Sequence, residues 1–243
     1  MKDSNTPTFL SLSDQLPLLL GKLRENNSRE WYRSNKDAYE THVMKPLKSL
    51  AEALASHMVQ IDSHISLKLS RPQRDTRFSA NKSPYKTEAW FAYHRADPEW
   101  TGMPAYFFEV TPDRCRYGMG FYSAKPATMG IARTIIQQQQ ELFLSTIKKA
   151  EEKGFTVEGT NYKRPPVMPP EGTPEPIRNI YGKKNVYLCR VSEYEPHIFD
   201  SRLLDYLIGD FALVSALYHL FLDARTCARD SLKNPMSQPP FSR

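Results

Sequence analysis

The apolar residues of this chain change their spacing twice, and these two changes constrain the fold more strongly than any other feature. From about residue 12 to residue 61 they recur every three or four positions, which is typical of amphipathic helices. Ile65, Leu67 and Leu69 then alternate with polar residues, which predicts a strand. Helical spacing returns after residue 126. This order predicts an α+β fold, with a mostly antiparallel sheet packed by an N-terminal helical hairpin and a C-terminal helix.

Polar caps, turns and prolines bound the expected elements. The predicted helices cover a segment from Ser11–Ser13 to Asn26–Asn27, and residues 29–34, 36–60, 126–153 (with one break) and 200–224. The predicted strands cover residues 65–69, 89–94, 104–111, 114–122, 155–158 and 186–191. We expect residues 71–78 to continue in an extended conformation. Pro46 removes a backbone hydrogen bond from the helix over 36–60, so we expect a kink there.

A proline-rich stretch interrupts the second half of the chain. Residues 163–176 contain six prolines, which predicts an extended segment outside any sheet. Only one predicted strand and one predicted helix follow it, which are too few to form a core of their own. We therefore interpret the stretch as a surface loop rather than a domain linker. We therefore predict one α+β domain over residues 1–225, followed by a polar tail over residues 226–243.

The composition narrows the cellular compartment and the classes of partner that we expect. The 243 residues include 33 lysines and arginines and 27 acids, so the net charge of +6 permits an anionic partner without requiring one. Three cysteines lie far apart in the sequence, which favours a reducing compartment. The N-terminus has no apolar signal segment, and the longest apolar run, residues 211–222, is too short to cross a bilayer. We expect a cytoplasmic protein with no membrane partner.

Several motifs that indicate a particular chemistry are absent from the sequence. There is no GxxxxGK[ST] loop, no GxSxG elbow and no HExxH pair. Gly118 and Gly120 lack the third glycine of a dinucleotide fingerprint, because Ser123 stands in its place. We therefore expect neither a metal site nor a cofactor.

The densest chemical information lies in residues 71–95, which hold six basic residues and two acids. Guanidinium forks, ammonium groups and a hydroxyl in one loop are suited to binding a phosphate or a carboxylate. The predicted ligand-binding residues of this cleft are Arg74, Arg77, Lys82, Tyr85 and Lys86. The alternative is a structural network of salt bridges. A nucleic-acid surface is a weaker alternative, because the basic stretch is short and its aromatics are irregularly spaced.

Asp75 lies between arginines and shares a strand face with Arg77 in the extended interpretation, so we predict a buried ion pair. The candidates for proton transfer are Asp75, Tyr85 and Glu109, and Glu109 is alternatively a salt-bridge partner. Arg133 falls in the first part of a helix, where a cation opposes the helix dipole, which favours a pairing or ligand-binding role. No nucleophile and base form a recognisable pair.

Three segments carry a resemblance to a known family. They are Arg74–Thr87 (RDTRFSANKSPYKT), Asn26–Tyr39, and a block formed by Ala105–Phe107, Gly118–Gly120 and Ile131–Arg133. Together they resemble the signature of a bacterial and fungal family, domain of unknown function 2461, over residues 9–225. The resemblance implies a compact α+β domain and no particular reaction.

From the residues themselves we expect binding of a small anionic, phosphate-bearing ligand in a basic cleft, with an enzymatic role left open. The alternative is a non-catalytic protein-interaction module whose basic network is structural. The sequence does not determine the substrate or the oligomeric state.

Overall fold

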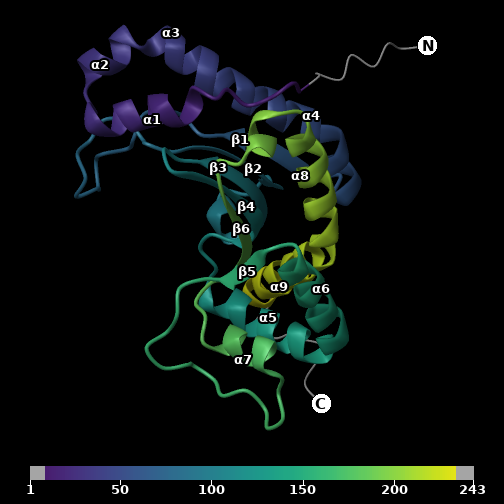
Figure 1. The fold of residues 1–243 in the computed structure, drawn as a ribbon. Coiled ribbons are helices and arrows are strands. Elements are labelled where there is room, and N and C mark those ends of the chain that lie inside the picture. The colour runs from purple at the N-terminus through teal and green to yellow at the C-terminus, as the bar shows by residue number, and fades with distance from the viewer. Residues whose placement is uncertain (1–8, 234–243) are drawn as a thin grey trace. The chain divides into compact units, whose positions relative to one another are not determined.

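A computed structural model describes residues 9–233 of the chain (Figure 1). It has the predicted α+β architecture, a six-stranded antiparallel sheet with flanking helices, in the strand order β1-β2-β3-β4-β6-β5. The strands are β1 Ile65–Leu69, β2 Ala89–Arg95, β3 Pro104–Val110, β4 Arg114–Phe121, β5 Phe155–Glu158 and β6 Tyr187–Glu193. The α-helices are α1 Leu16–Glu25, α2 Arg29–Ser34, α3 Lys36–Tyr39, α4 Lys45–Ile61, α5 Pro126–Gln138, α6 Gln140–Glu152, α7 Glu175–Tyr181, α8 Arg202–Leu213 and α9 Ser215–Lys233.

The chain divides into two compact units. The first unit comprises the described residues up to Tyr93, Phe107–Tyr117 and Val191–Gly209. The second unit comprises His94–Tyr106, Gly118–Arg190 and the described residues from Asp210 onward. The interpretation of residues 1–225 as one domain stays a prediction.

In the first unit, α1 packs on α3 and on the turn that follows it, and α4 packs on β1. A π-helical turn, Glu40–Met44, lies between α3 and α4, just before Pro46, and the expected kink itself stays a prediction. The proline has no N–H and its ring crowds the carbonyl four residues earlier, so a wider turn just before it relieves both problems. The apolar stripe Tyr39, Val43, Leu47, Leu50, Leu54 and Met58 is buried throughout.

In the second unit, α5 packs on α9, and α6 packs on β5, α7 and α9. Phe155 of β5 pairs with Arg190 of β6 in antiparallel register. Gly118 and Gly120 lie where β4 meets β6, and a Cβ atom at Gly118 would overlap the carbonyl of Leu188. The two glycines therefore permit close approach of two backbones, which explains the GMG motif without a cofactor.

The structure corrects three predictions in the second half of the chain. Helix α7 begins at Glu175, inside the stretch predicted to be extended, because prolines are tolerated in the first turn of a helix. The final helix is two helices, α8 and α9, which are bent by 53° where they meet. Helix α9 continues to Lys233, past the predicted end of the final helix at residue 224, and residues 234–243 of the predicted polar tail lie outside the described part.

None of the single helices in residues 9–233 combines the length and the apolar composition that crossing a membrane requires; only α8 and α9, as a bent pair, reach them together.

Candidate functional site

The predicted site segment is closed at its base by a short antiparallel pairing between residues 72–74 and 84–86. Gln73 and Tyr85 form an isolated β-bridge. The N–H of Arg74 donates to the carbonyl of Pro84 at 2.9 Å, and the N–H of Lys86 donates to the carbonyl of Pro72 at 2.8 Å. Because side chains alternate across such a pairing, Arg74 and Lys86 lie on the same face, opposite to that of Tyr85. The rest of residues 71–78 is a loop, so the prediction of a continuous extended segment is wrong.

A carboxamide from the N-terminal helices holds this pairing in place. The Nδ2 of Asn27 donates to the carbonyl of Tyr85, and the N–H of Tyr85 donates to the Oδ1 of Asn27, both at 3.0 Å. The ring of Tyr85 stacks on Tyr32 with their centroids 4.0 Å apart, and Tyr32 meets Tyr39 edge to face. Tyr85 is 9% exposed. Its ring therefore anchors the pairing, and the structure does not place it as an accessible ligand or proton-transfer group.

Three cations lie around the Lys86 ammonium group. Burial lowers the pKa of Lys86, and Lys68, Arg71 and Arg74 lower it further by repulsion. Glu88 is the one carboxylate that acts on this pKa in the opposite direction. The ammonium also lies 5.5 Å from the centre of the Trp90 ring, which stabilises the charged form. We call Lys68, Arg71, Arg74 and Lys86 the cation cluster.

Arg74 has an unused donor within the cation cluster. Its Nε–H is buried and donates to no acceptor within residues 9–233. An unpaired buried N–H on a charged group costs free energy. Of the predicted ligand-binding residues, the structure thus brings Arg74 and Lys86 together with Lys68 and Arg71, which were not named as site residues.

The Asp75–Arg77 pair is on the surface, so the prediction of a buried pair is wrong. The Nη2 of Arg77 lies 2.7 Å from the Oδ2 of Asp75, but the two side chains are 77% and 60% exposed. The side-chain hydrogen bond from Arg77 and a second one from its backbone N–H lower the pKa of Asp75 to about 2. The chain turns here instead of running extended. The Asp75 carboxylate therefore accepts from a backbone N–H of its own loop and is exposed to water.

Lys82 also serves the loop. Its ammonium donates to the carbonyl of Thr76 at 3.0 Å, which ties the two arms of residues 75–83 together. Arg77 and Lys82 thus both help to shape the loop, and their ligand-binding role stays a prediction.

Glu109 is a salt-bridge partner, which is the second of the two roles predicted for it. On β3, its Oε1 accepts from the Nε of Arg116 on the neighbouring β4 at 2.6 Å, and its side chain is 17% exposed. A carboxylate already held by a guanidinium fork is poorly placed to act as a base.

Arg133 lies in the second unit, on α5, and is 5% exposed. Its Nη2 donates to the carbonyl of Lys183 at 2.8 Å, and its Nε has no partner. Burial lowers the pKa of its guanidinium, while the hydroxyl of Tyr162 acts in the opposite direction. Arg133 is thus paired with neutral oxygens inside the second unit, and its ligand-binding role stays a prediction.

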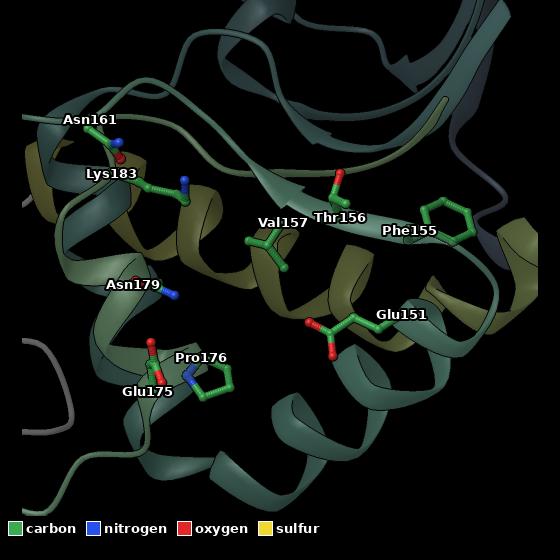
Figure 2. A pocket seen from close by; sticks show the side chains of 9 residues that line it. All are labelled: Glu151, Phe155, Thr156, Val157, Asn161, Glu175, Pro176, Asn179 and Lys183. Carbon is green, nitrogen blue, oxygen red and sulfur yellow. The ribbon is translucent and has the colours of Figure 1, made fainter. Parts of the chain in front are cut away.

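The second unit contains a pocket that sequence reasoning did not find (Figure 2). It has a volume of about 520 Å³, and Glu151 reaches into it from α6 while Glu175 and Asn179 reach into it from α7. Lys183 and Asn161 lie at another side, and β5 contributes Val157. Two carboxylates, one ammonium and two amides give this rim no preference for an anion. None of the predicted site residues lines it.

Within residues 9–233 there is no group of three or more His, Cys, Asp or Glu side chains placed to hold a metal ion.

The profile of a family described as "Conserved hypothetical protein (DUF2461)" matches residues 17–220. This range includes the paired segments 72–74 and 84–86, Asn27 and the whole cation cluster. No curated protein matches the chain.

Proposed function

We propose that this chain, which belongs to the DUF2461 family of conserved hypothetical proteins, binds a small phosphate-bearing anion at the cation cluster. The observation that carries the proposal is the gathering of three cations and only one carboxylate among the charges that act on the Lys86 ammonium. The proposal concerns binding and assigns no reaction.

Repulsion between the four cations supports this proposal. Positive charges held close together at a partly desolvated site destabilise one another, and an anion placed among them removes that cost. A phosphate carries several acceptor oxygens, so it can take hydrogen bonds from an ammonium and from a guanidinium at the same time. The unpartnered Nε of Arg74 is one such donor.

The rigidity of the pairing supports the proposal further. Arg74 and Lys86 project from segments that are joined by two backbone hydrogen bonds and held by the Asn27 carboxamide. Donors that are fixed before the ligand arrives lose little conformational entropy on binding. The contrast with Arg77 is informative, because Arg77 already has Asp75 as its partner and needs no other anion.

The three cysteines support the cytoplasm as the place of action. Cys115 and Cys189 are buried and Cys227 is half-buried, and none forms a disulfide. A chain whose three cysteines form no disulfide suits a reducing compartment.

The test is thermal unfolding with inorganic phosphate and with sulfate at constant ionic strength. We expect millimolar phosphate to raise the melting temperature, because a ligand that binds only the native state stabilises it. Arg74→Gln and Lys86→Gln should each reduce this shift. Lys48→Gln is the matched control, since Lys48 is an exposed lysine of the same unit whose ion pair with Glu52 is weak.

An equal shift in Lys48→Gln and in the two cluster variants would mean that any anion is bound elsewhere. The absence of a shift with either anion in the natural protein would contradict the proposal and favour the protein-interaction module.

A further inference from the structure

Strand β5 forms one edge of the sheet, because it lies last in the strand order, next to β6. On β6, the carbonyl of Val186 accepts from the N–H of Phe121 at 2.8 Å, on the side of β4. The carbonyl of Leu188, two residues later, faces the same side, since a Cβ atom at Gly118 would overlap it. These alternate residues of β6 therefore direct their backbone groups at β4 and not at β5.

Val157 of β5 is the register partner of Leu188. Because Leu188 directs its N–H and carbonyl at β4, the two residues exchange no hydrogen bonds, and the N–H and carbonyl of Val157 point away from β6 to the open edge. No backbone hydrogen bond from another segment of residues 9–233 reaches them. An extended peptide that adds a strand to a sheet uses such an unused donor and acceptor.

The pocket of about 520 Å³ in the second unit adjoins this edge, and three consecutive residues of β5 line it, Phe155, Thr156 and Val157. Consecutive side chains point to opposite faces of a sheet, so a pocket that touches all three runs along the edge of the strand. Figure 2 shows the Val157 side chain pointing toward α6 and α7 and that of Thr156 pointing away from them. A peptide residue placed opposite Val157 would share its face and point between these helices.

The charges on this face favour a basic side chain. Glu151 of α6 and Glu175 of α7 reach into the pocket, and among the described residues that line it Lys183 alone is a cation. Neither carboxylate forms an ion pair or a side-chain hydrogen bond within residues 9–233. A guanidinium presents several donors in one plane and can donate to two carboxylates at once.

We propose that β5 receives an extended segment of a partner protein, which pairs with Val157 and places an arginine or a lysine between Glu151 and Glu175. The surface lies wholly within the second unit, so the inference does not depend on the anion site. Backbone pairing supplies affinity, and the two carboxylates select the basic residue. The β5 strand of a second copy is a poor occupant, because its sequence, FTVE, offers no basic residue and adds a carboxylate.

The experiment titrates the blocked pentapeptide Ac-TVRVT-NH2 into the ¹⁵N-labelled protein and follows the amide signal of Val157 by NMR. The peptide should bind about fivefold or more tightly than Ac-TVEVT-NH2, which replaces attraction by repulsion. Methylation of the arginine backbone nitrogen removes the donor that would reach the Val157 carbonyl, so this third peptide should not bind. In the protein alone, the Val157 amide should exchange with solvent faster than those of Thr156 and Glu158, which face β6.

Glu151→Gln and Glu175→Gln should each weaken the binding of the arginine peptide about two- to fivefold. Glu152→Gln is the matched control, because Glu152 is the next residue of α6 and does not line the pocket. All three side chains are exposed, so these changes do not put folding at risk.

Equal affinities for the arginine and glutamate peptides would overturn the proposal, and so would binding of the methylated peptide. The absence of binding of Ac-TVRVT-NH2 at millimolar concentration would overturn it as well. A Val157 amide that is protected in the protein alone, together with a dimer whose population rises with concentration, would mean that a second copy occupies the edge and not a basic partner.

Discussion

Asn27 and Tyr85 lie 58 positions apart in the sequence and are joined by two hydrogen bonds of 3.0 Å, through which the Asn27 carboxamide pairs with the Tyr85 backbone as another peptide group would. One side chain thereby satisfies both backbone groups of a residue that has no further strand beside it. The N-terminal helices and the candidate site are connected through this contact.

Asn27→Ala should destabilise the protein by about 1–3 kcal/mol, because it leaves a half-buried N–H and carbonyl without partners. Urea unfolding followed by circular dichroism measures this change. Asn26→Ala is the control, since the Asn26 side chain is exposed and only donates to the carbonyl of Lys22. An equal decrease in the free energy of unfolding of the two variants would show that the contact between Asn27 and Tyr85 does not stabilise the protein more than an exposed hydrogen bond does.

The Asp75 carboxyl should titrate with a pKa near 2, as followed by NMR. In Arg77→Ala the pKa should rise part of the way toward 3.8, because the backbone N–H of residue 77 still donates to it. The stabilisation from a lowered carboxyl pKa is present above 3.8 and is lost as the pH falls toward 2. Here it is small, because both side chains are exposed. A large fall in the melting temperature of Arg77→Ala at neutral pH would contradict this and would indicate that Asp75 and Arg77 form a buried ion pair.

Anion binding should become weaker at alkaline pH. Burial and the neighbouring cations lower the pKa of Lys86 from 10.5, so its ammonium loses its proton earlier than an ordinary lysine does. The stabilisation by sulfate, whose own charge is constant in this range, should therefore fall as the pH rises toward 10.5. Lys86→Arg should abolish this pH dependence, because arginine stays charged.

Without a bound anion, the contribution of Lys86 to the stability of the protein should change with pH in the opposite direction. Since the pKa of Lys86 is lower in the folded state, the unfolded chain binds more protons, and the contribution of this group to stability increases with pH in the same window. A sulfate effect that is independent of pH in the natural protein would exclude Lys86 from the site.

Gly118→Ala should destabilise the protein by about 3 kcal/mol or more, because the added Cβ would overlap the backbone of Leu188 and force β4 away from β6. Gly130→Ala is the matched control on α5, where nothing lies within 4 Å of the added atom. It should stabilise the protein by about 0.5–1 kcal/mol, as alanine favours the helix. Thermal melts of the two variants should move in opposite directions.

Sequence reasoning located elements best where polar, turn-forming residues bound a short segment. Helix α2 and strands β1 and β5 begin and end at the predicted residues. Helix α7 was missed because Pro174 and Pro176 indicate a loop and the start of a helix equally well. The break between α8 and α9 was missed because the apolar stripe continues through Val214, so the spacing carries no trace of the bend.

The candidate site was predicted only in part, for a related reason. Arg74 and Lys86 lie in one dense stretch, so composition was enough to single them out. Lys68 belongs to β1, and only the arrangement of the folded chain brings it to Lys86. The stacking of Tyr85 on Tyr32 depends on a contact between distant residues, which local spacing does not encode.

The π-helical turn over Glu40–Met44 also sets the phase of the apolar repeat. Tyr39, Val43 and Leu47 follow one another at intervals of four, and a regular α-helix would carry such a series steadily off the buried face. The wider turn absorbs the surplus, so Tyr39 and the stripe of α4 stay on one side. A regular α-helix over the same residues would place Tyr39 about 80° away from Leu47 and out of the tyrosine stack beneath Tyr85, since eight residues turn by about 800°. Deleting one residue from this turn should instead restore a regular helix with Tyr39 on the buried face, since seven residues turn by about 700°.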